Sequence, residues 1–332
     1  MGASVAWTGN ELGVAWRSGY KGDSRLWFAR LTPEGYWHSE PEQLVQSVWA
    51  VYTPRLAYSS GAYAVAWLSG LGQDSLFLGS GYLVLDALGE VKDSFETMQQ
   101  RAQMYPGASM EGFKLFYFED GAPWVQSFDP DGSVVGSPLA LEDDIGLVGQ
   151  FRMHDYVWTG TEHALLWELE HRLQLNRFAA DGSRAAAPLV LAETQYNTAY
   201  ASLAFNGSEY AAVWADAPPT WLVRVSAAGQ LVSEPVAVSD EIAWDAPVLT
   251  WTGEEWVISW TEYPSPLSVW ARRLAPDGSA PYEKLQLATD AGLESISPAV
   301  ALAEGALSVL WDQYDGVSDY DELVTLRVGL CR

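Results

Sequence analysis

One motif returns seven times along this sequence, at intervals near 50 residues. Its consensus is P-x-L-x-W-T-G-x-E-x-x-V-x-W, and the clearest copies cover residues 3–16, 54–67, 201–214, 247–260 and 298–311. A sixth copy covers 154–167, and a degraded one covers 106–118. The aromatic residues that close the copies lie 46 to 51 residues apart; they are Trp16, Trp67, Phe118, Trp167, Trp214, Trp260 and Trp311. A repeat of this length that fills the chain predicts a series of equivalent, stacked units.

Each repeat contains four short segments with the alternation of a β-strand. In the second strand of the second copy, the large Tyr63 and Trp67 alternate with the small Ala64 and Ala66. Large residues on one face and small ones on the other suit sheets that stack face to face. The third strand ends in a turn such as residues 275–278, where glycine supplies the positive φ that a tight hairpin needs.

Four antiparallel strands repeated seven times predict an all-β, seven-bladed β-propeller. The expected blades of this single domain (residues 1–332) cover residues 3–53, 54–105, 106–153, 154–200, 201–246, 247–297 and 298–332. We expect the last blade to lack its outer strand, because no strand-like segment follows 323–330. The Met- and Gln-rich segment 93–105 interrupts blade 2, and we expect a short helical turn there.

The charge of the chain limits its partners. Acidic residues outnumber basic ones 43 to 18, which gives a formal net charge of −25. Such a field disfavours nucleic acid and anionic membrane surfaces and favours cations or basic partners, although acidity can also serve solubility alone. The longest apolar runs have the length of a strand, so we expect no membrane insertion, and we expect a monomer.

The Trp-Thr-Gly-x-Glu turn at 251–255, which leads into the Val-x-x-Trp strand and then Arg-Leu-x-Pro-Asp-Gly at 273–278, resembles the propeller repeats of secreted or surface proteins in myxobacteria and related bacteria. The resemblance implies an extracellular or cell-envelope location and a role in recognition or scaffolding. It carries over no catalytic residues. The start at Met1 shows no signal peptide, which fits a trimmed secreted protein, and Cys331 is the only cysteine, so we expect no internal disulfide.

Aromatic residues outside the repeat phase are the first candidates for ligand contact. They fall where the fourth strand of one repeat crosses to the first strand of the next; they are Trp49, Tyr52, Tyr196, Tyr200 and Trp244. Aromatic faces near the mouth of a propeller can stack on sugar rings or hold a peptide. The alternative is that these side chains seal the blade junctions.

Carboxylates that follow the closing aromatic of the second strand are the second candidates. They occur in blades 3 to 7 and are Glu119, Glu168, Asp216, Glu262 and Asp312. Clustered carboxylates could hold Ca²⁺ or attract a basic ligand, or they could be ordinary solvated acids. A denser acidic loop in the last repeat, with Asp315, Asp319 and Asp321, is a separate candidate metal site.

Evidence for catalysis is weak in the sequence. The four histidines, His38, His154, His163 and His171, lie at different phases of the repeat, so a zinc site or catalytic triad lacks its parts. We therefore expect non-catalytic recognition or scaffolding, with a carbohydrate or protein ligand. The alternatives are a polysaccharide-active enzyme that uses paired carboxylates, Glu168 with Glu262 or Asp216, and a structural spacer in an envelope protein.

Overall fold

The computed structural model describes most of the chain, and the described residues contain no helix. Those residues are 2–19, 24–47, 50–70, 77–97, 105–109, 112–119, 122–141, 151–194, 200–216, 218–241, 243, 245, 247–263, 265–288, 293–304, 306–314 and 322–329. The chain divides into two compact units, which we describe separately. Unit 1 comprises Met1–Asp143 with Ala299–Arg332, and unit 2 comprises Asp144–Pro298.

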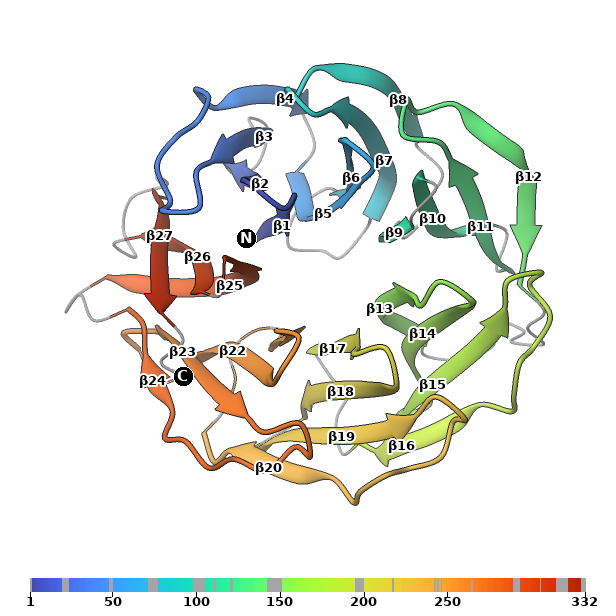
Figure 1. The fold of residues 1–332 in the computed structure, drawn as a ribbon, viewed down its shortest axis with the longest axis vertical. Coiled ribbons are helices and arrows are strands. Elements are labelled where there is room, and N and C mark those ends of the chain that lie inside the picture. Colours follow the sequence, from blue (N-terminus) through green and yellow to red (C-terminus); the bar gives the residue numbers. More distant parts are fainter. Residues whose placement is uncertain are drawn as a thin grey trace. The chain divides into compact units, whose positions relative to one another are not determined.

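Unit 1 contains three sheets of four antiparallel strands, each in simple chain order (Figure 1). Blade 1 consists of β1 (Ala3–Trp7), β2 (Leu12–Ser18), β3 (Ser24–Leu31) and β4 (Glu42–Ser47). Blade 2 consists of β5 (Ala50–Ser59), β6 (Ala62–Gly70), β7 (Phe77–Asp86) and β8 (Val91–Thr97). Blade 3 consists of β9 (Tyr105–Ser109), β10 (Gly112–Glu119), β11 (Ala122–Phe128) and β12 (Val134–Ala140).

Unit 2 contains three further sheets with the same order. Blade 4 consists of β13 (Phe151–Trp158), β14 (Glu162–Leu169), β15 (Arg172–Ala179) and β16 (Leu189–Glu193). Blade 5 consists of β17 (Tyr200–Phe205), β18 (Glu209–Ala215), β19 (Thr220–Ser226) and β20 (Val236–Ser239). Blade 6 consists of β21 (Val248–Trp251), β22 (Trp256–Glu262), β23 (Ser268–Leu274) and β24 (Leu285–Gln286).

Blade 7 has three strands among the described residues. They are β25 (Glu294–Ala303), which begins in unit 2 and ends in unit 1, β26 (Ala306–Tyr314) and β27 (Glu322–Gly329). The sheets confirm the expected fold, a seven-bladed all-β propeller whose last blade lacks its outer strand within the described part of the chain. The short helical turn expected within 93–105 is absent from the described residues of that range, and residues 98–104 lie outside the described part of the chain. Residues 93–97 form no helical turn, because they pair in β8 with β7, with Phe95 opposite Tyr82.

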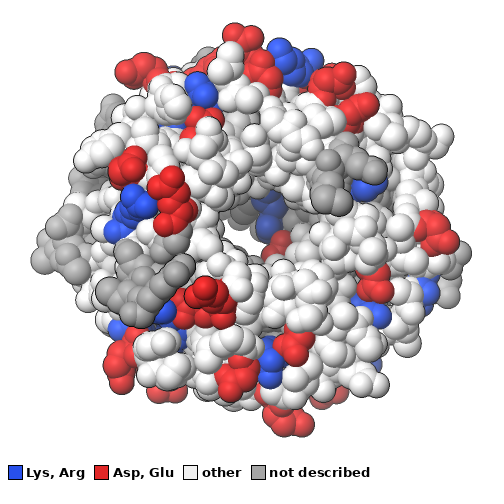
Figure 2. All heavy atoms as spheres, viewed as in Figure 1, with Lys and Arg blue, Asp and Glu red and all other residues white. Residues whose placement is uncertain are grey.

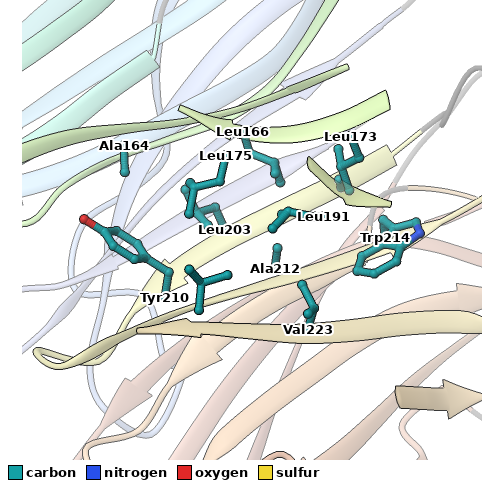
Figure 3. Close-up of a cluster of buried hydrophobic side chains, with 12 residues drawn as sticks. Ala164, Leu166, Leu173, Leu175, Leu191, Leu203, Tyr210, Ala212, Trp214 and Val223 are labelled. Carbon is teal, nitrogen blue, oxygen red and sulfur yellow. The ribbon is translucent and has the colours of Figure 1, made fainter. Parts of the chain in front are cut away.

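The alternation of large and small residues stacks the sheets as expected. Tyr63 and Trp67 pack with Phe28 of blade 1, whereas Ala64, on the other face of β6, packs with Phe113 of blade 3. The same pattern fills unit 2, where side chains of blades 4 and 5 form one buried cluster (Figure 3). Six of the seven aromatic residues that close the repeat are core residues, as Trp167 at 1% exposure and Trp260 at 0% illustrate, whereas Trp16 is half-buried.

Two glycines in strands mark where aromatic rings approach the neighbouring backbone. A Cβ at Gly13 would lie 2.2 Å from Cε1 of Tyr63, and a Cβ at Gly81 would lie 2.2 Å from Cζ2 of Trp67. Both rings are buried. Glycine therefore leaves room for a ring between two blades at Gly13 and within one blade at Gly81.

An ion pair that recurs within several blades is linked by a hydrogen bond to the turn of the next blade. The glutamate that follows the Thr-Gly or Asn-Gly turn pairs with an arginine of the third strand, as Glu162 does with Arg177 at 3.4 Å. The same arginine donates a hydrogen bond to the carbonyl oxygen of Ala227, in the glycine turn of blade 5. Equivalent sets are Glu11, Arg30 and the Ala87 carbonyl, and Glu209, Arg224 and the Pro276 carbonyl. We call this arrangement the junction clamp.

The first strands of adjacent blades are also linked by side chains that accept backbone hydrogen bonds. Leu56 N–H donates to Ser4 Oγ at 2.9 Å, and Leu203 N–H donates to Asp155 Oδ2 at 2.9 Å. Each bond crosses from one sheet to the next. These bonds fix the relative height of neighbouring blades, and so the loops at their ends are positioned by the core.

Candidate functional site

Several of the predicted ligand-contact residues lie outside the described residues: Trp49, Trp244 and Tyr196, and the predicted metal ligands Asp315, Asp319 and Asp321. The two remaining tyrosines lie at strand starts. Tyr52 is in β5 opposite Leu68, and Tyr200 is in β17 opposite Ala215.

The five predicted carboxylates do not share one environment. Glu119, at the end of β10, is exposed, and Asp216, just after β18, is half-buried. Glu168, Glu262 and Asp312 are 2%, 7% and 2% exposed. The last three are therefore not solvated loop acids, because the ends of the second strands are enclosed by neighbouring segments.

Glu262 is held by three different donors. Lys284 Nζ lies 2.7 Å from Oε1 and 2.9 Å from Oε2, Trp260 Nε1 donates to Oε1 at 3.0 Å, and Ser239 Oγ donates to Oε1 at 3.1 Å. Lys284 also lies over the ring of Trp270, 4.4 Å from its centroid. A buried carboxylate with a cation and two neutral donors is fully engaged within the protein.

Glu168, in blade 4, is also enclosed, but its neighbours are mostly neutral. Thr194 Oγ1 donates to its Oε1 at 2.6 Å, and His154 Nε2 lies 3.9 Å from its Oε2. Burial lowers the pKa of His154 from its usual value, with the nearby Glu168 acting in the opposite direction. The imidazole is thus kept neutral near pH 7. Glu168 and His154 are therefore buried residues with a structural role.

The crossing from blade 5 to blade 6 meets the end of β22. Ala243 forms an isolated antiparallel bridge with Glu262. Asp245 accepts a hydrogen bond at Oδ2 from the backbone N–H of Ser297, at 2.6 Å, and burial raises the pKa of Asp245. Ser295 N–H in turn donates to the carbonyl of Leu267 at 2.9 Å. The crossings and the loops that follow the second strands therefore meet in unit 2.

We call the region around Ala243, Asp245, Glu262, Tyr263 and Leu267 the loop face, in which Glu262 and Leu267 are buried. Its exposed side chain is Tyr263, at 48%, directly after Glu262. Sequence reasoning missed Tyr263, Asp245 and Lys284. The first was detectable as an aromatic next to a predicted carboxylate; the other two act through contacts with distant strands that no local pattern encodes.

The acidic charge is not gathered at one place on the viewed side of the molecule. Figure 2 shows Asp and Glu side chains interspersed with Lys and Arg over that face. Among the described residues, no group of three or more His, Cys, Asp or Glu side chains has the arrangement of a metal site. No helix in the described part of the chain is long and apolar enough to cross a membrane.

Comparisons identify the fold and no family. No protein-family model matches the sequence, and no curated protein matches it either. Among solved structures, the polysaccharide lyase Uly1 is similar with a TM-score of 0.61 and 12% identity, over 99% of this chain and 90% of the lyase.

Two similar structures are propellers by name. The beta-propeller domain of the Trilobed protease from Pyrococcus furiosus has a TM-score of 0.52 and 9% identity, over 97% of this chain and 98% of that domain. The Dos1 propeller has a TM-score of 0.53 and 10% identity, over 97% of this chain and 85% of the other. At these identities the likeness shows the propeller fold alone, because one fold supports unrelated functions.

Proposed function

We propose that this protein is a non-catalytic recognition module that binds its ligand at the loop face. The observation that carries the proposal is the internal engagement of Glu168 and Glu262. A catalytic acid or base must reach the substrate, and these two carboxylates are buried and bonded to Thr194 and Lys284 instead. The engagement of both members of the Glu168–Glu262 pair supports binding over catalysis by that pair, and the alternative pair of Glu168 with Asp216 also contains the enclosed Glu168.

The exposed chemistry at the loop face suits binding. Tyr263 offers an aromatic ring with a polar end, beside the crossing that carries Trp244 in the sequence. Aromatic rings of this kind stack on sugars and anchor peptides. We propose a carbohydrate as the ligand class and a protein segment as the alternative, with Ca²⁺ as a candidate co-ligand at the acidic loop around Asp315.

The proposal is tested by a glycan-array screen, run once with calcium and once with a chelator. Specific binding that is lost in Tyr263→Ala supports it. Tyr282→Ala is the matched control, because Tyr282 is 47% exposed in the same blade but lies in the turn region before β24. Equal loss in both variants, or hydrolysis of a bound glycan, would contradict the proposal. Silence on every glycan would discard the carbohydrate class.

We also propose that the protein acts outside the cytoplasm. Support comes from the resemblance of its repeats to those of secreted bacterial proteins and from the acidic composition. Fractionation of cells that express the natural gene, followed by immunodetection, tests this. Protein confined to the cytoplasmic fraction would overturn the location without affecting the binding proposal.

A further inference from the structure

Blade 6 departs from the repeat at the residue before its closing aromatic. That residue is Ser259, whereas the other six blades have an aliphatic residue or a tyrosine there: Ala15, Ala66, Tyr117, Leu166, Val213 and Leu310. Ser259 is 0% exposed, and its hydroxyl has no hydrogen-bond partner in the described part of the chain. A buried hydroxyl without a partner is costly, and a bound ion or water is one explanation for such a group.

A second buried oxygen of this kind lies in the crossing from blade 5 to blade 6. Asp245 Oδ1 is buried and accepts no hydrogen bond from the described residues, while Oδ2 accepts the Ser297 N–H at 2.6 Å. No salt bridge joins Asp245 to a described lysine, arginine or histidine. Glu262, by contrast, is neutralised by Lys284. A buried carboxylate oxygen without a cation is unfavourable, so Asp245 has a coordination position to fill.

Thr261 connects these two oxygens. Ser259 and Thr261 are two residues apart in β22, so their side chains project from the same face of the strand. Thr261 is 0% exposed, and its Oγ1 accepts the Ser297 N–H at 3.1 Å, the same N–H that Asp245 binds. The crossing, the end of β22 and the beginning of β25 therefore meet around these side chains, all within unit 2.

The backbone at this meeting point has an uncommon conformation. Ser297 has a φ of 56°, in the left-handed region that residues other than glycine seldom adopt. In this conformation its N–H reaches both Asp245 and Thr261. Backbone strain of this kind persists where the surrounding structure holds it, and binding sites are among those places.

The donor atoms restrict the class of ligand. They are one carboxylate oxygen and two hydroxyl oxygens, which are hard ligands suited to alkali and alkaline-earth cations. The described residues contain no group of three or more His, Cys, Asp or Glu side chains that could hold a metal, so a zinc site or a calcium site rich in carboxylates is unsupported. One carboxylate balances one positive charge. Because both unpartnered oxygens are enclosed, a small ion fits better than an organic cation.

We propose that Na⁺ binds between Asp245 Oδ1, Ser259 Oγ and Thr261 Oγ1. The ion neutralises the carboxylate and ties the crossing from blade 5 to the beginning of β25, next to the loop face. The net charge of −25 supports the proposal, because a negative field raises the local concentration of cations. This site is separate from the acidic loop around Asp315, and its test requires no ligand at the loop face.

The first test is urea unfolding of the whole protein in sodium chloride and in choline chloride, at equal ionic strength and without calcium. Screening is the same in both salts, but choline is too large for an enclosed site. We expect a higher urea midpoint in sodium chloride. At a Na⁺ concentration about nine times its Kd, the folding equilibrium constant should rise about tenfold. Equal midpoints in the two salts would overturn the proposal and leave water as the partner of these oxygens.

A matched pair of variants locates the ion. Asp245→Asn should abolish the difference between the two salts. Asp240→Asn should retain it, because Asp240 is an exposed acid of the same crossing and its removal changes the net charge equally. Broadening of the sodium NMR signal by the protein should likewise be reduced more by Asp245→Asn than by Asp240→Asn. Equal responses of the two variants would mean that Na⁺ is held only by the general field of the protein.

Ser259→Ala keeps the proposal testable if Asp245→Asn does not fold. Alanine occupies this position in blades 1 and 2, as Ala15 and Ala66, so the variant fits the repeat. If Ser259 is an ion ligand, the variant should raise the urea midpoint in choline chloride and reduce the difference between the two salts. An equal rise in both salts would show only the removal of a buried hydroxyl and would contradict the proposal.

Calcium chloride provides the last comparison. A larger midpoint shift than in sodium chloride at equal ionic strength, lost in Asp245→Asn, would overturn the assignment to a monovalent ion.

Discussion

The junction between blades 4 and 5 and the junction between blades 2 and 3 solve the same packing problem with different chemistry. The first uses the junction clamp, in which Arg177 joins Glu162 to the turn of blade 5. The second has Val84 at the position of Arg177, in a cluster with Ala64 and Phe113. At this position the first junction has an ion pair and the second has an apolar contact.

The two junctions share the packing features that the fold requires and differ in the ion pair that only one of them has. Both junctions stack sheets through large and small side chains, and both place a turn glycine against the preceding third strand. Gly229 faces Arg177, and Gly132 faces Val84. Close approach of the turn is thus shared, whereas the ion pair is a local addition to an apolar scaffold.

The largest expected effect comes from placing the ionic chemistry in the apolar junction alone. Val84→Arg buries a cation at a site that is 1% exposed, and it should lower the free energy of unfolding by about 3–5 kcal/mol. Urea unfolding measures the loss. Val84→Met, which adds volume without charge, is the control and should cost about 1–3 kcal/mol, less than the arginine.

Adding the missing partner sharpens this test. Ala62 occupies the position of the clamp glutamate, five residues before the closing Trp67, as Glu162 is before Trp167. Ala62→Glu combined with Val84→Arg should recover about 1–2 kcal/mol relative to the single arginine variant. A double variant no more stable than Val84→Arg would show that the junction clamp cannot be transferred between blades.

Removal of the clamp from its own junction is the next largest effect. Arg177→Ala leaves Glu162 and the Ala227 carbonyl without their cation, and the Arg177 side chain is only 8% exposed. We expect a loss of about 2–4 kcal/mol in urea unfolding. Arg172→Ala, which removes a 58% exposed arginine 4.0 Å from Glu193, should stay within about 0.5 kcal/mol. Equal losses would mean that the clamp does not stabilise the junction.

The fold was predictable from the sequence because its determinants are periodic. Trp167 and Trp260 are buried because they recur at one phase of the repeat, and the hairpin turns follow from glycine. The junction clamp could also have been predicted from the sequence, because Glu162 with Arg177 and Glu209 with Arg224 recur at the same separation of 15 residues.

The site was less predictable because its contacts join distant segments. Glu262 lies at the end of a second strand, β22, but its enclosure depends on Lys284 and on Ser239 of the preceding blade. Glu168 likewise depends on Thr194, after the fourth strand. Neither partner is marked by the repeat, and so the sequence could not distinguish an enclosed carboxylate from a solvated one.

The buried polar groups of unit 2 should also make its stability sensitive to acid. Burial lowers the pKa of His154, so the folded state binds a proton less readily than the unfolded chain, whose histidine titrates near 6.5. Stability is therefore fully present above that pH and is lost as pH falls below it. We expect His154→Gln to reduce the loss of unfolding free energy between pH 7.5 and 5.5, and the exposed His171→Gln not to. Parallel pH dependence in both variants would assign the acid sensitivity elsewhere.

The smallest effect is expected from an exposed ion pair, and measuring it tests whether such a pair stabilises the fold as the junction clamp does. Lys92 Nζ lies 2.8 Å from Asp86 Oδ2 at the turn of blade 2, and the lysine side chain is 42% exposed. The pair lowers the pKa of Asp86, yet Asp86 also accepts hydrogen bonds from the backbone N–H groups of Leu88 and Glu90, which hold the turn without the lysine. Because solvent screens an exposed pair, Lys92→Ala should leave the urea midpoint unchanged within error, whereas Asp86→Ala should lower it. A loss in Lys92→Ala as large as that in Arg177→Ala would remove the distinction between exposed and enclosed ion pairs on which the contrast between the two junctions depends.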